Sequence, residues 1–268
     1  MSGRFYPGAK AELAATVAGL LKDARSSPPA PFRAVIVPHA GYVYSGPTAA
    51  AVFARVALPT LIIILAPNHT GVSRAPGGAS LWEDGAFRTP LGDVLVDEPC
   101  AAAVRAASPL VAVDHEAHRA EHAIEVLLPF LQVLRPDARI VPLVLAWDVW
   151  EPGGARELGD ALARVVREAA EPILLVASSD LNHYEPAAVS EQKDARALEA
   201  VTALDGAELL ARCRLERISM CGRGPAAAVL AAARALGATR ADVVDYRHSG
   251  WVSGDDSQVV GYGGVVIP

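Results

Sequence analysis

Four residues of types that bind metals or move protons come shortly after apolar segments of the chain. They are His39, His69, Asp180 and His183. The apolar segments before them span residues 34–37, 61–66 and 173–178. Neutral imidazole is a common ligand for iron, copper and zinc, and a histidine can also transfer protons near neutral pH. Metal binding or proton transfer is therefore the chemistry that these residues predict.

The segments before these residues determine whether the side chains can meet. All three are short and apolar, with many β-branched residues, which is typical of buried parallel strands. In open α/β sheets, ligands bind in the crevice outside the carboxyl ends of the strands. We therefore expect two imidazoles, an aspartate and a third imidazole to converge at one rim of a sheet.

Each of these residues also has a structural interpretation. His39 stands between Pro38 and Gly41, where a histidine at a strand end can serve only as a hydrogen-bonding loop residue. Asp180 could cap a helix, with His183 as its capping partner. In the functional interpretation, Asp180 orients or assists His183, which donates or accepts the substrate proton. The residues alone leave both interpretations open.

Cys221 is the cysteine with a candidate chemical role. It precedes Gly222 and Arg223 at the expected start of a helix. A helix N-terminus and a neighbouring arginine both lower the pKa of a thiol, and the thiolate is the form that binds metals. Packing is the alternative role, and it is the role expected for Cys100 and Cys213 in their alanine- or leucine-rich surroundings.

A second group of histidines lies near the middle of the chain. It comprises His115, His118 and His122, with Glu121 between the last two. His118 and His122 would share one face of a helix, but the segment lacks the glutamate placement of a zincin motif. We expect His115 and His118 to be loop or surface residues. Glu121 and His122 are expected to lean into the site from a helix start.

The composition restricts the class of protein. Of the 268 residues, 52% are hydrophobic, so a large core is available, and a net charge of −6 argues against nucleic-acid binding. No apolar run could span a bilayer, and the first residues lack the apolar stretch of a signal peptide. Three cysteines without CxxC spacing indicate no disulfide framework, so a reducing cytoplasm is the expected location. The absence of a G-x-S-x-G elbow, a P-loop and a dinucleotide motif disfavours those enzyme classes.

Helical and strand patterns alternate along the chain. Helices are expected at residues 9–25, 47–56, 99–107, 121–134, 155–169, 186–203 and 206–213 and from Met220 onward, with a loop at 26–31. Strands are expected at residues 33–37, 61–66, 139–145, 242–246 and 258–267 and from Ile173 onward, with an antiparallel hairpin at 79–97. This alternation predicts an α/β fold, with one α/β/α sandwich around a mostly parallel mixed sheet and a single domain over residues 1–268.

Six short motifs resemble those of a known family. They are RFYPG at 4–8, PHAGY at 38–42, PNH at 67–69, EHAIEVLLPF at 121–130, SSDLNH at 178–183 and CGR at 221–223. These motifs resemble the Memo family, whose prokaryotic members are called AmmeMemoRadiSam system protein B. They occur in the family's order and span nearly the whole chain, so the resemblance is specific.

The resemblance implies a metal site. The family is similar to class III extradiol ring-cleavage dioxygenases, which share the α/β/α core. It implies that His39, His69 and Cys221 are metal ligands, with Asp180 and His183 beside them as catalytic groups. In the dioxygenases a glutamate takes the place that Cys221 would take here, which puts ordinary ring cleavage in doubt. A soft thiolate favours copper or a redox-active iron.

The first functional hypothesis is therefore a mononuclear redox or oxygenase-like metalloenzyme that uses Fe(II) or copper, with zinc as a further option. Substrate-binding residues expected to line its pocket are Tyr42, Tyr44, Glu121, His122, Asn182, Tyr184 and Arg223. The ligand would be a small molecule or a peptide.

Two alternative functions remain open. The first is a binding or scaffold module that recognises phosphotyrosine-like groups, peptides or partner proteins of a radical SAM system, as associations of the family imply. The second, weaker alternative is a metal-dependent hydrolase that activates a zinc-bound water. Neither alternative requires a membrane or a nucleic acid.

Overall fold

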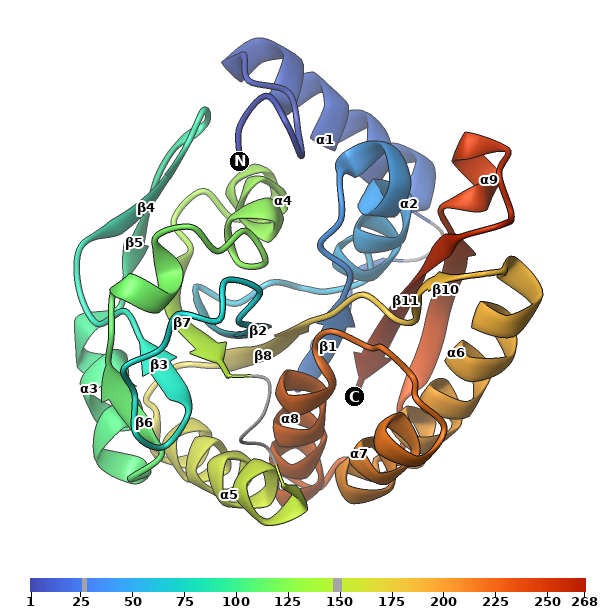
Figure 1. The fold of residues 1–268 in the computed structure, drawn as a ribbon. Coiled ribbons are helices and arrows are strands. Elements are labelled where there is room, and N and C mark those ends of the chain that lie inside the picture. The colour runs from blue at the N-terminus through green and yellow to red at the C-terminus, as the bar shows by residue number, and fades with distance from the viewer. Residues whose placement is uncertain (26–27, 147–150) are drawn as a thin grey trace.

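The structure, a computed structural model, describes residues 1–25, 28–146 and 151–268. In this part of the chain, eleven strands form one mixed sheet with helices on both faces (Figure 1). The centre of the sheet consists of four parallel strands, β1 (Ala34–Val37), β8 (Ile173–Ser178), β2 (Leu61–Pro67) and β7 (Arg139–Leu145). The predicted α/β fold is confirmed. The expected loop at 26–31 falls partly outside the described residues.

The order of the central strands decides which loops meet. β8 lies between β1 and β2, with Val37 paired to Ser178 and Leu65 paired to Ala177. The loops that follow β1, β8 and β2 therefore leave the sheet side by side, although they are far apart in the sequence. In α/β sheets this edge, at the carboxyl ends of the strands, is where ligands bind.

Further strands flank the centre on both sides. β11 (Val259–Ile267) pairs with β1, and both β10 (Asp242–His248) and β9 (His183–Glu185) pair with β11. On the other side lie β3 (Ala79–Leu81), β6 (Val111–Val113) and the hairpin of β4 (Ala86–Thr89) and β5 (Gly92–Val96). The hairpin expected at 79–97 thus comprises only β4 and β5, since β3 joins the main sheet by pairing with β7.

The helices form two layers (Figure 1). One face of the sheet carries α1 (Lys10–Ala24), α2 (Tyr42–Phe53) and α4 (Leu128–Leu134). The other carries α3 (Glu98–Ala107), α5 (Pro152–Glu168), α6 (Ala187–Thr202), α7 (Gly206–Leu215) and α8 (Arg223–Ala235). Short helical turns are η1 (Glu116–His118), η2 (Glu125–Leu127) and α9 (Gly250–Ser253).

Alternate residues of the central strands supply two separate cores. In β2, Ile63 and Leu65 pack with α5 and α8, whereas Ile62 and Ile64 pack with α1, α2 and α4. All four side chains are fully buried. A strand covered on both faces must be apolar throughout, which explains the continuous apolar run of β2.

Two helices differ from the sequence prediction. α2 begins at Tyr42, directly after Gly41, and not near Pro47, which lies inside the helix. The helix expected over 121–134 forms only from Leu128, preceded by η2. Its first residues take a turn because the carboxylate of Glu121 accepts hydrogen bonds from the backbone N–H groups of residues 122 and 123. These N–H groups are thus satisfied without a helix.

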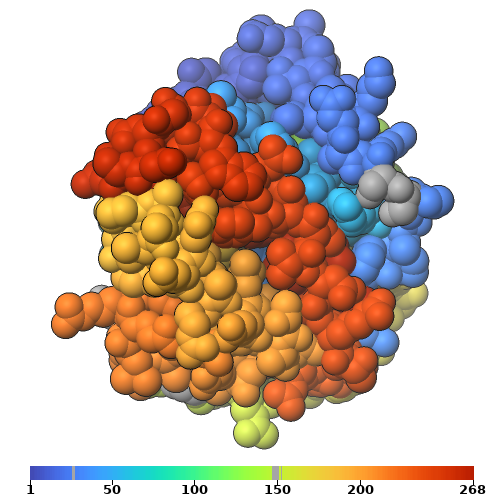
Figure 2. Space-filling model, turned by 90° about the vertical axis from the view of Figure 1, so that its right-hand side faces the viewer, coloured from blue at the N-terminus to red at the C-terminus, as the bar shows by residue number. Residues whose placement is uncertain are grey.

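The last two strands, β10 and β11, lie between helices from the N-terminal and C-terminal halves of the chain. Figure 2 shows C-terminal residues, in red, between the N-terminal helices, in blue, and the α6–α7 region, in yellow and orange. Accordingly, β10 and β11 contact both α2 and α6. Among the described residues, no helix combines the length and apolarity that crossing a membrane would require.

Close packing of α5 on α8 gives a prediction about stability. A Cβ atom at Gly159 would lie 2.6 Å from the backbone oxygen of Ala228 and 2.6 Å from Cβ of Ala231. Because backbone must move to admit it, we expect Gly159→Ala to lower the free energy of unfolding by about 1–3 kcal/mol in urea denaturation. Gly153→Ala in the same helix, where a Cβ meets nothing within 4 Å, is the control. Equal stability of the two variants would contradict this account of the packing.

Candidate metal centre

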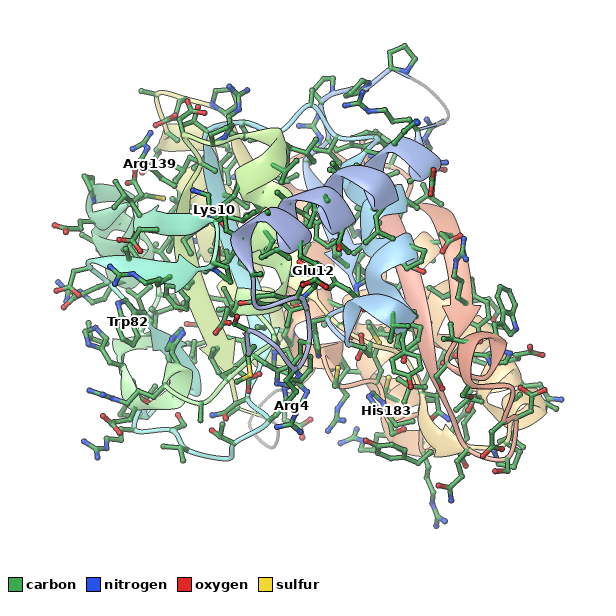
Figure 3. All side chains as sticks on the ribbon, turned by 90° about the horizontal axis from the view of Figure 1, so that it is seen from above. Arg4, Lys10, Glu12, Trp82, Arg139 and His183 are labelled. Atoms are coloured by element: carbon green, nitrogen blue, oxygen red, sulfur yellow. The ribbon has the colours of Figure 1, made fainter. Side chains whose placement is uncertain are left out.

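The candidate centre lies at the carboxyl edge of the central strands. His39 follows β1, Asp180 follows β8 and His69 follows β2, so the three come from adjacent strands. In Figure 3, His183 and Arg4 lie at this end of the molecule, and Arg139, which begins β7, lies at the opposite end. The residues expected to converge after the strand ends therefore do lie at one edge of the sheet.

The ring of His39 is held in one tautomer. Its Nδ1 lies 2.8 Å from Oγ of Ser178, and that hydroxyl donates its only proton to the backbone oxygen of Ala123 at 2.6 Å. The Nδ1–H group must therefore donate to Ser178, which leaves the lone pair on Nε2. The backbone N–H of His39 donates to Oδ1 of Asp180 at 2.8 Å. With 1% exposure, His39 is buried, and burial, followed by nearby His69, lowers its pKa well below the usual value.

Glu121 holds the ring of His69. One carboxylate oxygen accepts the backbone N–H of His69 at 2.6 Å, and the other lies 2.9 Å from Nδ1. Burial alone would raise the pKa of Glu121, but hydrogen bonds from His69 and from backbone N–H groups outweigh it and bring the pKa to about 2. A charged carboxylate can only accept a hydrogen bond, so Nδ1 of His69 carries the proton and the lone pair of the ring is on Nε2.

A third imidazole, that of His122, completes a cluster. The ring centroids of His39 and His69 are 5.2 Å apart, and that of His122 lies 5.4 Å from the first and 4.6 Å from the second. One nitrogen from each ring lies within 4.8 Å of the others. Burial lowers the pKa of His122 to about 4, so the ring is neutral near pH 7 and able to bind a metal.

Cys221 belongs to a second group with His39 and Asp180. Its Sγ lies 3.4 Å from Nε2 of His39 and accepts the backbone N–H of Asp180 at 3.1 Å. Ligand atoms of the three residues are within 4.8 Å of one another. The two groups share His39, whereas His69 and Cys221 fall in different groups, so the expected set of His39, His69 and Cys221 spans both.

The state of the Cys221 thiol differs from the sequence prediction. Burial raises its pKa well above the usual value, and the charge of nearby Asp180 raises it further. Hydrogen bonds from the backbone N–H groups of Asp180 and Gly222 lower the pKa of this thiol, but burial outweighs them. Without a metal, the thiol of Cys221 therefore keeps its proton.

His183 and Asp180 lie beside this cluster. The backbone N–H of His183 donates to Oγ of Ser219 at 2.8 Å, and its Nδ1 faces the backbone oxygen of Ser219 at 3.0 Å. A carbonyl only accepts, so Nδ1 carries the proton and Nε2 can accept one. Burial raises the pKa of Asp180, while the charge of His183 acts in the opposite direction. His183 is thus placed to exchange protons at the edge of the centre.

Two expected pocket residues, Tyr42 and Asn182, make hydrogen bonds that hold loops of the site, and Tyr42 also lines the groove described below. Tyr42 is buried and donates its hydroxyl proton to the backbone oxygen of Val126 at 2.8 Å. Asn182 is fully buried, donates to Oε2 of Glu185 at 2.6 Å and accepts the backbone N–H of Ser219 at 3.0 Å. Both side chains are occupied in holding loops of the site.

The remaining expected pocket residues lie nearer the surface. Tyr44 is 37% exposed and Tyr184 is 72% exposed. Arg223 is the first residue of α8. Tyr44 lines a groove of about 650 Å³ together with Arg4 and Phe5. The groove runs beside the centre, since Phe5 stacks on His122 with ring centroids 4.5 Å apart.

The expectation for His118 was wrong. The residue is only 5% exposed and donates from Nε2 to the backbone oxygen of Ser80 at 3.0 Å. Burial lowers its pKa to about 4. His115, which is half-buried, stacks on Trp82 with centroids 4.3 Å apart. Neither belongs to the two candidate ligand groups among the described residues.

Ser178 and Phe5 were not among the residues predicted to form the centre. Both stand inside motifs that were recognised, SSDLNH and RFYPG, so a signal was present. Their roles depend on contacts between distant segments: Ser178 lies 139 residues from His39 in the sequence. Side-chain type and local spacing do not encode such a contact.

The tautomers give a test that needs no metal. In the metal-free protein near pH 7, we expect His39 and His69 to carry their ring protons on Nδ1, because Ser178 and Glu121 accept them. Long-range ¹H–¹⁵N NMR spectra distinguish the two tautomers. Ser178→Ala should release the preference at His39 and leave that of His69 unchanged. An Nε2–H tautomer at His39 in the wild-type protein would contradict the assignment.

A buried aspartate that supports the site should make stability depend on pH. Asp194 accepts the backbone N–H of Asn182 and the hydroxyl proton of Tyr246, both at 2.8 Å. Burial raises its pKa to about 7, above that of the unfolded chain. Its contribution to stability is therefore complete below about pH 4 and is lost as the pH rises through 7, on the order of a few kcal/mol.

Asp194→Asn should remove this loss, so that the variant gains stability relative to the wild type between pH 4 and 8 in denaturant titrations. Asp137→Asn, a change at an exposed position, is the control and should leave the pH profile as it is. A profile of Asp194→Asn parallel to that of the wild type would refute the assignment.

Comparison with known proteins identifies the family of this chain. The family model described as Memo-like protein matches residues 1–266. A MEMO1 family protein of Methanopyrus kandleri is 39% identical over 280 residues, covering 100% of this chain and 97% of the relative. One of Aquifex aeolicus is 38% identical over 271 residues, with coverage of 100% and 97%.

A solved structure shares the fold. It is that of an uncharacterized protein from Escherichia coli K12, with a TM-score of 0.58, 15% identity and coverage of 88% of this chain and 100% of that one. At this identity the likeness concerns the fold alone. The family model and the two relatives carry the assignment of family, and on their evidence the chain belongs to the Memo family.

Proposed function

We propose that this protein binds one transition-metal ion at the carboxyl edge of its sheet and uses it for redox or oxygenase-like chemistry. The ion would be Fe(II) or copper, with zinc as a further option. Ligands implied by the family resemblance are His39, His69 and Cys221. The residues fit such an ion, because they offer two imidazole nitrogens and one cysteine sulfur, donors that suit these metals.

The observation that carries the proposal is the position of the His39 lone pair. Ser178 fixes this lone pair on Nε2, and Sγ of Cys221 lies 3.4 Å away. Metal–nitrogen and metal–sulfur bonds of about 2.1 and 2.3 Å place two ligands of a tetrahedral ion roughly 3.5 Å apart. The 3.4 Å separation of these two atoms matches this distance and supports the proposal.

The surrounding residues would supply the rest of the chemistry. A bound ion contributes Lewis acidity and, for iron or copper, electron transfer. His183 keeps its proton on Nδ1 and accepts a substrate proton at Nε2. Asp180 fixes the backbone of His39. Burial of His39 and Cys221 shields these two donors from water.

Metal analysis tests the proposal directly. After anaerobic purification, the wild type should contain about one iron or copper ion per chain, and His39→Ala should lose it, because His39 is common to both ligand groups. His115→Ala removes a histidine outside the centre and should retain the metal. Metal-free wild-type protein, or equal metal content in His39→Ala and the wild type, would refute the proposal.

A second candidate function rests on the groove. Its walls include the aromatic rings of Phe5 and Tyr44 and one cation, Arg4, which lies 5.6 Å from the Phe5 ring. Such walls suit an aromatic group with a negative charge, such as a phosphotyrosine-like or peptide ligand. Calorimetry with phosphotyrosine and catechol, together with oxygen uptake, separates the two functions. Binding without oxygen uptake or product would favour a binding module.

A further inference from the structure

A buried histidine away from the candidate centre has a ring nitrogen without a partner. His248, the last residue of β10, is 3% exposed. In the described part of the chain, its Nδ1 is buried and meets no hydrogen-bond partner. A buried polar atom of this kind is unfavourable unless a water or an ion satisfies it. This nitrogen is therefore a candidate for binding a ligand.

Glu191 in α6 determines that this nitrogen carries the lone pair of the ring. Its Oε1 lies 3.4 Å from Nε2 of His248. A carboxylate only accepts hydrogen bonds, so the proton of the neutral ring belongs on Nε2, and the lone pair is on Nδ1. In metal sites, a carboxylate behind a ligating histidine orients the ring in this way and raises its basicity.

Two oxygen atoms border the same space as this lone pair. A Cβ atom added to Gly250 would lie 2.9 Å from Nδ1 of His248. It would also lie 3.0 Å from the backbone oxygen of Asp255, and closest of all to Oδ1 of Asp256. Because residue 250 is glycine, a small space remains that one nitrogen and two oxygens surround.

These donors suit a zinc ion. Imidazole nitrogen and carboxylate oxygen are both ordinary ligands of zinc, whereas calcium and magnesium prefer oxygen ligands alone. Zinc has no geometric preference from its d-electrons, so water can complete the coordination beside Asp256, which is exposed. Glu191 and Asp256 also place a carboxylate near each nitrogen of the ring, and their negative charge favours a cation.

We propose that His248, Asp256 and Asp255 form a second metal site, which binds one zinc ion through Nδ1, the carboxylate and the backbone oxygen. The ion fastens the loop after α9 to the end of β10. That loop also holds the start of α6, because the backbone oxygen of Asp256 accepts the N–H of Ala187 at 2.9 Å. None of these residues belongs to the candidate centre, so the site does not depend on the proposed function.

Equilibrium dialysis of the metal-free protein against zinc tests the site. His248→Phe keeps a flat ring but removes the nitrogen, so it should bind one zinc ion per chain fewer than the wild type. Glu191→Gln should weaken this binding about tenfold, as loss of a partner behind a ligand does. His115→Phe and Asp137→Asn are the controls and should bind as the wild type does. Equal zinc content in His248→Phe and the wild type would overturn the inference.

NMR of the wild type provides a second measurement that does not depend on how the variants fold. Near pH 7, long-range ¹H–¹⁵N spectra should show the proton of His248 on Nε2, and zinc should shift the Nδ1 resonance. A resonance that zinc leaves in place, in a neutral or a doubly protonated ring, would also overturn the inference. If His39→Ala still loses iron or copper in that case, the proposed function stands. A wild type whose candidate centre takes up neither iron nor copper, but whose His248 responds to zinc, would leave this second site intact.

Discussion

The hydrogen bond between Nδ1 of His39 and Ser178 is the constraint on which the candidate centre depends. Ser178 can only accept it, because its own proton is committed to Ala123. The lone pair of the ring is thereby fixed on Nε2, toward Cys221. If the ring reversed its tautomer, an N–H group would face the thiol, and Nε2 of His39 could not bind an ion.

This hydrogen bond exists because of the strand order. β8 lies between β1 and β2, so Ser178 at the end of β8 is next to the loop that carries His39. Residues that follow β8 then supply Asp180 and His183 at the same edge. Glu121, at the turn before η2, holds His69. The two imidazoles are therefore positioned by separate parts of the chain, each through an acceptor for Nδ1–H.

The fold and the convergence of strand-end residues could be predicted from the sequence because buried parallel strands have continuous apolar runs and deliver their last residues to one edge. Details that depend on distant contacts could not. The carboxylate of Glu121 that satisfies the backbone N–H groups of the turn also holds His69, 52 residues away in the sequence. Burial decides the state of the Cys221 thiol, although local sequence suggested a thiolate. His118 was expected to be a loop or surface residue, but it is buried, and its Nε2–H donates to the backbone oxygen of Ser80.

The most direct test of the central claim is a crystal structure of the metal-loaded protein with an anomalous-difference map at the metal edge. The account predicts one peak within about 2.3 Å of Nε2 of His39, with Nδ1 still bonded to Ser178. A peak on Nδ1, or iron or copper bound without contact to His39, would contradict it.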